Sequence, residues 1–181
     1  RDKAIVDPLT GLLNRYALGR RAGELEQQSL LAREPVGVIV ADLDGFKALN
    51  DSHGHGRGDD ALAGAARLLH EGSERAFDYA YRLGGDEFVI LVPGARIPEA
   101  CAIAHKARAS VCSAILAGGL RLSVSCGVSA SEGGEPFDYG RVFGAADAAL
   151  YEAKRTGEGV AWAPAAATTV VASMEEGRAL G

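Results

Sequence analysis

The chain has 181 residues, a length that suits one domain of ordinary size and is short for two. Hydrophobic residues make up 48% and charged residues 24%, which is the usual balance of a globular protein and excludes global disorder. The formal net charge of -5 argues against binding of a nucleic acid polymer, because such proteins place a basic surface against the phosphate backbone.

The cellular location is predicted from what the chain lacks. No apolar run reaches the roughly 18 to 20 residues of a membrane helix, and no signal peptide opens the sequence. The three cysteines, Cys101, Cys112 and Cys126, are widely spaced and typical of reduced thiols. We therefore expect a cytoplasmic domain. Because residue 1 is arginine, we also expect a fragment of a longer protein, whose remainder could be membrane-anchored.

The first third of the chain predicts a leading segment, a helix and a strand. Residues 1–13 contain turn signals and are expected to form an entry segment. Apolar residues at helical spacing predict a helix over residues 14–33, with Asn14 as its N-cap and Pro35 beyond its end. The Val- and Ile-rich run 36–43 predicts a strand buried on both faces.

The middle of the chain predicts a loop, a helix and a hairpin. We expect a Gly/His loop over residues 53–58 and a helix over 59–70, capped by Asp59 or Asp60. Two apolar runs, 79–83 and 87–92, are separated by a glycine pair, which indicates a hairpin turn.

The last third predicts further alternation and therefore an α/β fold. We expect helices over 98–116 and 138–154, the latter ended by Gly157, and strands over 120–128 and 159–163. This order indicates a central mixed sheet flanked by helices. We assign residues 14–163 to one domain and 164–181 to a linker or loose tail.

Acidic residues fall where the predicted strands end. Asp42 closes the first strand, whereas Asp86 and Glu87 follow the hairpin glycines. If the two strands are neighbours, these carboxylates meet and supply the oxygen ligands that Mg²⁺ takes together with substrate phosphates. The alternative is that each is a solvated turn residue.

The Gly/His loop leaves two weaker interpretations open. Residues 54–59 resemble a phosphate-binding loop before a helix but lack the Lys-Ser/Thr pair of a Walker motif. His53 and His55 could bind a transition metal, although a polar loop histidine is the favoured interpretation because no third ligand is near.

Four short motifs, at residues 7–15, 42–47, 84–88 and 151–154, together resemble those of the GGDEF family of diguanylate cyclases. Residues 84–88 read Gly-Gly-Asp-Glu-Phe, the signature that names the family. Residues 7–15 (DPLTGLLNR) resemble its opening motif, 42–47 (DLDGFK) its substrate segment with Asn50-Asp51 and Gly58-Asp59, and 151–154 (YEAK) its last helix. The resemblance spans roughly residues 5–163 and implies a nucleotidyl cyclase, palm-like fold with a mostly antiparallel sheet.

The resemblance implies an enzyme that condenses two GTP into cyclic di-GMP and two pyrophosphates. It implies two Mg²⁺ (or Mn²⁺) ions per GTP, held by Asp42, Glu87 and the backbone carbonyl of Leu43. It assigns deprotonation of the attacking 3′-hydroxyl to Asp86, and a catalytic role also to Glu87 and Lys154.

The resemblance also assigns the substrate contacts. Guanine would be read by Asn50 and Asp59, and phosphates would be bound by Lys47, Lys154 and the amides of Gly45 and Phe46. His55, Gly84 and Gly85 complete the expected substrate-binding set. Two adjacent positions depart from the family, because Glu158 and Gly159 stand where arginine and then asparagine are usual. A carboxylate beside a triphosphate is unfavourable unless it is distant or solvated.

A second motif indicates an inhibitory site for the product. Arg75 and Asp78 match the family's RxxD site, and Arg82 is expected to complete that pocket. The alternative is an ordinary surface ion pair.

Because each domain presents one GTP, the resemblance implies a homodimer driven by an upstream sensory domain. Rival hypotheses are a catalytically weak cyclic di-GMP receptor, a cyclase with altered base choice and a dimerisation module.

Overall fold

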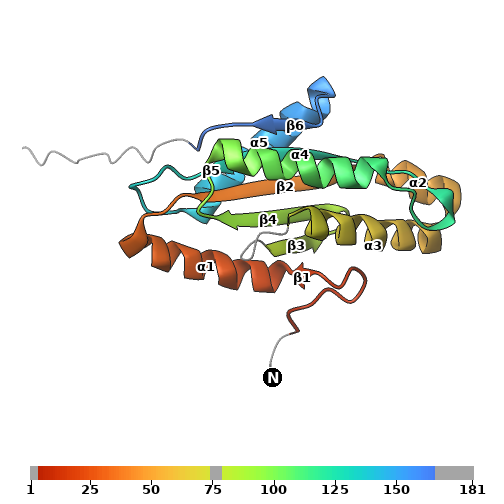
Figure 1. The fold of residues 1–181 in the computed structure, drawn as a ribbon. Helices are drawn as coiled ribbons and strands as arrows, with labels where there is room; N and C mark the ends of the chain where they lie inside the picture. Colours follow the sequence, from red (N-terminus) through yellow and green to blue (C-terminus); the bar gives the residue numbers. More distant parts are fainter. Residues whose placement is uncertain (1–3, 74–78, 166–181) are drawn as a thin grey trace, which may run out of the picture.

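The computed structural model describes residues 4–73 and 79–165, which form one sheet with helices on both sides (Figure 1). The strands are β1 (Leu13–Asn14), β2 (Val36–Asp44), β3 (Tyr79–Gly84), β4 (Glu87–Pro93), β5 (Ser123–Ala130) and β6 (Val160–Trp162). The helices are α1 (Arg15–Ala32), α2 (Phe46–His53), α3 (His55–Gly72), α4 (Ile97–Ser113) and α5 (Tyr139–Thr156), with a short 3-10 turn at Ala117–Gly119. None of the helices in these two ranges combines the length and hydropathy needed to cross a bilayer.

The six strands lie in the order β1-β3-β4-β2-β5-β6, with β2 near the centre. β2 runs antiparallel to both β4 and β5, and β3 runs antiparallel to β4. The outer pairs, β1 with β3 and β5 with β6, are parallel. The predicted mixed, mostly antiparallel sheet is thus confirmed.

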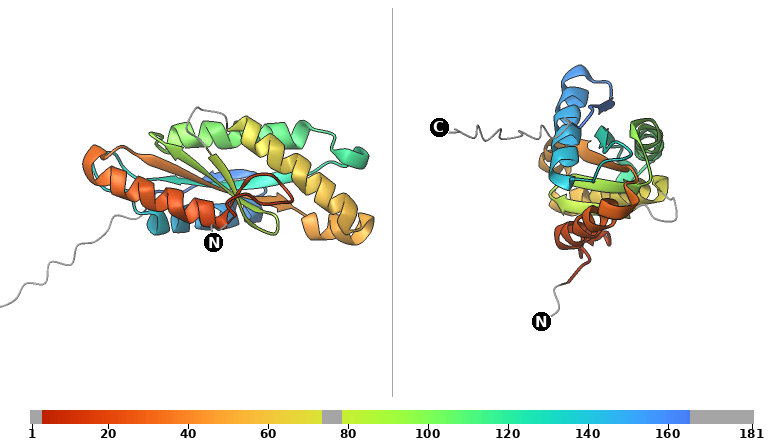
Figure 2. Two further views of the ribbon diagram at one scale, coloured as in Figure 1. Left: turned by 90° about the horizontal axis from the view of Figure 1, so that it is seen from below. Right: turned by 90° about the vertical axis from the view of Figure 1, so that its left-hand side faces the viewer.

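Each face of the sheet carries its own core. Ile39, Ala41 and Leu43 of β2 pack on the side covered by α3 and α4. Val38 and Val40, which alternate with them, pack on the side covered by α1 and α5. The end-on view in Figure 2 shows these two helical layers on opposite sides of the strands. The prediction that β2 is buried on both faces is confirmed.

Several predicted helix ends are confirmed by their capping contacts. The Asn14 side chain accepts a hydrogen bond from the amide of Ala17 at 3.1 Å and so caps α1. α5 ends at Thr156, and its C-cap residue Gly157 adopts φ +75° and donates its amide to the carbonyl of Ala153.

Two local predictions were wrong. α3 begins at His55 rather than Asp59, and Gly54 stands before it, so most of the expected Gly/His loop is helical. In the hairpin, Gly84 pairs with Glu87, so the two turn residues are Gly85 and Asp86 rather than the two glycines. The loop prediction was wrong because it rested on the three glycines of this segment, although Gly58 is buried inside α3.

Residues before Asn14 also join the sheet edge. Val6 forms an isolated bridge with Leu13, and Leu13 pairs with Tyr81 of β3. The boundaries placed after residues 13 and 163 stay predictions.

Candidate active site

Asp42 and Glu87 face each other across neighbouring strands. In the antiparallel register of β2 and β4, Asp42 pairs directly with Glu87 at the end of the ladder. Directly opposed residues of an antiparallel pair project from the same side of the sheet. The expectation that the two strand ends lie side by side is therefore confirmed, and both carboxylates belong to the side covered by α5.

A backbone hydrogen bond joins the hairpin tip to β2. The amide of Leu43 donates a hydrogen bond to the carbonyl of Asp86 at 3.2 Å, one step beyond the Asp42 pairing. Gly84 adopts φ +144° and Gly85 φ +55°, a combination that side-chain-bearing residues rarely reach. The two glycines thus permit a tight turn that brings Asp86 close to the strand carrying Asp42.

Lys154 lies across the carboxylates from α5. Its Nζ forms an ion pair with Asp42 and lies 3.8 Å from Asp44 Oδ1. The Asp44 carboxylate accepts hydrogen bonds from the hydroxyls of Ser123 and Ser125, each at 2.7 Å. Asp44 and the two serines were not predicted, although the alternating serines of the 123–125 segment are a signal that one strand face is polar.

Negative charge gathers at this end of the sheet, and Lys154 offsets only part of it. Burial raises the pKa of Asp42, and the charges of Asp86 and Asp44 add to this, outweighing the opposing effect of Lys154. Burial also raises the pKa of Glu87, with further contributions from Asp42, Asp147 and Asp86. A bound cation would relieve this repulsion.

The residues present fit a hard divalent cation. Two opposed carboxylates and the adjacent backbone carbonyl of Leu43 offer oxygen donors only, the set that Mg²⁺ prefers. Within residues 4–73 and 79–165, no cluster of three or more His, Cys, Asp or Glu side chains forms a complete metal cage. Mg²⁺ usually completes its shell with water and substrate phosphates.

The predicted guanine-reading residues come together where α2 meets α3. Asn50 lies on α2, and its buried Oδ1 atom has no hydrogen-bond partner in the described part of the chain. A Cβ atom at Gly58 would lie 1.6 Å from that oxygen, so the Asn50 side chain packs directly against α3 beside Asp59. Asp59 and His55 are exposed on the first turns of α3.

The predicted phosphate-binding segment follows β2 directly. Gly45 adopts φ +65° as the N-cap of α2, with no side chain capping that helix. The amides at the start of α2 therefore have no side-chain acceptor and suit an anion. Phe46 is partly buried and Lys47 exposed on the first turn of the same helix.

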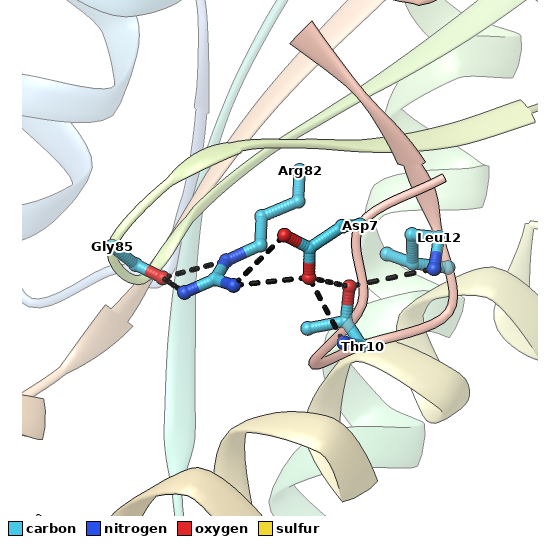
Figure 3. Close-up of polar contacts among 5 residues, drawn as sticks. All are labelled: Asp7, Thr10, Leu12, Arg82 and Gly85. Carbon is cyan, nitrogen blue, oxygen red and sulfur yellow. Dashed lines mark hydrogen bonds and ion pairs between the residues drawn. The ribbon is translucent and has the colours of Figure 1, made fainter. Parts of the chain in front are cut away.

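Arg82 connects the hairpin turn to the first residues of the chain, as Figure 3 shows. Its Nε and Nη2 donate to the carbonyl of Gly85 at 3.0 and 2.8 Å, and its Nη1 forms an ion pair with Asp7 at 3.0 Å. Asp7 in turn accepts hydrogen bonds from the amide and hydroxyl of Thr10. The guanidinium is thus engaged by the turn, and its predicted part in an inhibitory pocket stays a prediction.

The other two residues of the predicted inhibitory site, Arg75 and Asp78, lie outside the described residues.

Comparison with known proteins identifies relatives of this chain. Residues 4–159 match the family model described as "Diguanylate cyclase, GGDEF domain". The chain is 38% identical over 151 residues to diguanylate cyclase DgcM of Escherichia coli, covering 83% of this chain and 36% of that protein. It therefore spans about a third of the length of this relative.

Solved structures share the fold. Diguanylate cyclase SiaD of Pseudomonas aeruginosa, solved in complex with its activator SiaC, superposes with a TM-score of 0.81 at 36% identity, covering 88% of this chain and 62% of that one. The GGDEF domain of DgcB from Caulobacter crescentus, solved in complex with c-di-GMP, gives a TM-score of 0.80 at 28% identity, covering 90% and 97%.

Proposed function

This chain belongs to the GGDEF family, and from that premise we propose that it is a diguanylate cyclase that condenses two GTP into cyclic di-GMP and two pyrophosphates. The observation that carries the proposal is the pairing of Asp42 with Glu87 across β2 and β4. An acidic pair beside a glycine turn suits metal-assisted phosphoryl chemistry better than a purely structural role.

Asp42, Glu87 and the carbonyl of Leu43 would hold the Mg²⁺ or Mn²⁺ ions, two per GTP. These ions would neutralise the triphosphate and stabilise the negative charge that develops on the reacting phosphate. Lys154, now paired with Asp42, would then be released toward the phosphates. Lys47 and the amides of Gly45 and Phe46 would bind the same phosphate chain.

Base selection would come from the junction of α2 and α3. The Asp59 carboxylate can accept from the two donors on guanine's edge and would repel the ring acceptor of adenine. Asn50 would contribute a second polar contact from α2. His55, Gly84 and Gly85 border the remaining substrate surface.

Asp86 would accept the proton from the attacking hydroxyl. In each half-reaction the 3′-oxygen of one GTP bonds to the α-phosphorus of the other, the bond from that phosphorus to the bridging oxygen breaks, and pyrophosphate leaves. Because one domain presents one GTP, two copies must face each other, and a sensory domain elsewhere in the longer protein would control that encounter. We place the domain in the cytoplasm, where GTP is available.

The test is GTP turnover by this chain fused to a dimerising helix, with Asp86→Ala as control. We expect cyclic di-GMP and pyrophosphate in a ratio of one to two, and no product from the variant. A chain that binds cyclic di-GMP but never forms it would instead be a receptor.

We also propose product inhibition through Arg75 and Asp78, with Arg82 nearby. Arginine's planar fork suits bidentate contact with phosphate or a guanine edge. Arg75→Ala should raise the inhibition constant for cyclic di-GMP, and equal constants for the two proteins would refute this site.

A further inference from the structure

A polar pocket of about 390 Å³ opens beside Lys154. It is lined by Asp44, Gly45, Arg108, Ser123, Ser125, Ala153, Lys154, Gly157 and Gly159. Two of these residues, Gly45 and Lys154, belong to the phosphate contacts of the proposed function. Arg108 reaches the same pocket from α4, and no role has yet been given to it.

A single hydrogen bond to the described part of the chain positions the Arg108 guanidinium. Its Nε donates to the carbonyl of Val124 at 3.1 Å. Within the described residues it forms no ion pair and no other hydrogen bond, so its two terminal nitrogens stay available to a ligand. The nearby Asp44 carboxylate is instead occupied by two serine hydroxyls. Arg108 is therefore positioned by the fold but not neutralised by it.

Gly159 makes room for this arrangement. A Cβ atom at that position would lie 2.2 Å from Nε, 2.5 Å from Cζ and 2.7 Å from Nη2 of Arg108. The guanidinium thus packs against bare backbone, and any side chain at position 159 would displace it. Gly159 also adopts φ +79°, a conformation that favours glycine.

We propose that Arg108 binds the terminal phosphates of GTP, as the second side-chain cation of this pocket beside Lys154. The inference rests on the proposed function and names a residue of its substrate site. A guanidinium with two free terminal nitrogens suits phosphate oxygens, and the start of α2 lies on the same pocket through Gly45. Position 158 cannot supply a cation for the phosphates, because it is occupied by the exposed carboxylate of Glu158.

The test compares GTP and GMP binding by calorimetry with Mg²⁺, using a GTP analogue that cannot react at its α-phosphate. Arg108→Ala should weaken binding of the analogue about 10-fold or more and leave GMP binding unchanged, because GMP lacks the terminal phosphates. Turnover should show a raised KM with a nearly constant kcat. Arg67→Ala, which removes an exposed arginine paired with Glu71 on α3, is the matched control.

Two further variants separate ligand binding from a structural role. Glu158→Arg added to Arg108→Ala should restore affinity for the analogue, which a lost packing contact would not allow. Gly159→Ala should weaken binding of the analogue as Arg108→Ala does, because the added methyl group displaces the Arg108 guanidinium. Arg108→Met keeps the aliphatic stem and replaces the alanine variant if that one does not fold.

The outcomes are distinct. A wild-type chain that binds no GTP analogue overturns the proposed function and this inference with it. Wild-type binding that Arg108→Ala and Arg108→Met leave intact overturns the inference alone. An equal loss of GTP and GMP binding assigns Arg108 a structural role and also overturns it.

Discussion

The carboxylate of Asp7 binds the guanidinium of Arg82 75 residues further along the chain, and the same guanidinium holds the carbonyl of Gly85 in the signature turn. Both side chains of the ion pair are largely buried, with 14% and 18% of their areas exposed. The first described segment of the chain is thereby tied to the turn that carries Asp86. A displacement of this segment should therefore also displace the turn.

Arg82→Ala should lower both stability and turnover. It removes the donors to the Asp7 carboxylate and the Gly85 carbonyl, at a cost of about 1–3 kcal/mol in the free energy of unfolding. The loosened turn should reduce kcat about 10-fold with little change in GTP affinity, because Asp86 is misplaced rather than lost. Urea unfolding and steady-state kinetics measure the two effects.

A double-mutant cycle with Asp7→Ala provides the control. The two losses should be less than additive if both residues act through this ion pair. Although burial would raise the pKa of Asp7, hydrogen bonds from Thr10 and the contact with Arg82 lower it overall from 3.8. The contribution of this ion pair to the free energy of unfolding should therefore be complete above pH 3.8. It should vanish as the pH falls through the lowered pKa of Asp7 in the folded chain.

Gly58→Ala should impair recognition of GTP while Gly56→Ala does not. Both glycines lie in the first turns of α3, but a Cβ at Gly58 meets Asn50 Oδ1 at 1.6 Å whereas one at Gly56 meets nothing within 4 Å. The Asn50 side chain must move, so we expect at least a 10-fold rise in KM for GTP. Identical KM values for the two variants would contradict a substrate role for Asn50.

Glu87→Gln should separate metal binding from folding. Burial and the charges of Asp42, Asp147 and Asp86 raise the pKa of Glu87, so its ionised form is disfavoured in the folded chain without metal. The neutral variant should keep or slightly gain stability in chelator, lose the rise in melting temperature that Mg²⁺ gives the wild type, and lose turnover about 100-fold or more. Glu71→Gln on α3 is the control, and a Mg²⁺ response equal in both variants would remove Glu87 from the site.

Much of this geometry could be predicted from the sequence, because it depends on local patterns. The Val- and Ile-rich run predicted β2, and the glycines between two apolar runs predicted the hairpin. The proximity of Asp42 and Glu87 followed from these two predictions once the strands were assumed to be neighbours. The start of α3 could not be predicted, since the buried contact of Gly58 with Asn50 is tertiary. The contact of Asp7 with Arg82 and the place of Arg108 against Gly159 likewise depend on the folded chain and leave no periodic signal.

Alkaline unfolding should report the buried phenol of Tyr81. Burial raises the pKa of Tyr81 to about 12, against an ordinary value of 10.0. Between these values the folded chain keeps a proton that the unfolded chain releases, so stability falls as the pH rises from 10 toward 12. Tyr81→Phe should make that fall shallower, whereas Tyr151→Phe, at a site 69% exposed, should leave it unchanged. Urea unfolding across this pH range measures the slopes.

Gly127→Ala should destabilise the packing of α5 on β5. A Cβ at Gly127 of β5 would lie 2.0 Å from the carbonyl oxygen of Ala146 and 2.2 Å from the amide nitrogen of Leu150, both backbone atoms of α5. Because backbone cannot rotate away, α5 must lift from the sheet, at a cost of about 2–4 kcal/mol in the free energy of unfolding. The lifted helix would also carry Lys154 away from Asp42, so GTP affinity should fall together with stability.

Gly144→Ala is the matched substitution on the helix itself. A Cβ there meets nothing within 4 Å, and replacing an exposed helical glycine by alanine should stabilise α5 by about 1 kcal/mol. Chemical unfolding of the two variants should therefore shift in opposite directions from the wild type. Equal shifts would mean that α5 does not pack closely against β5 at Gly127.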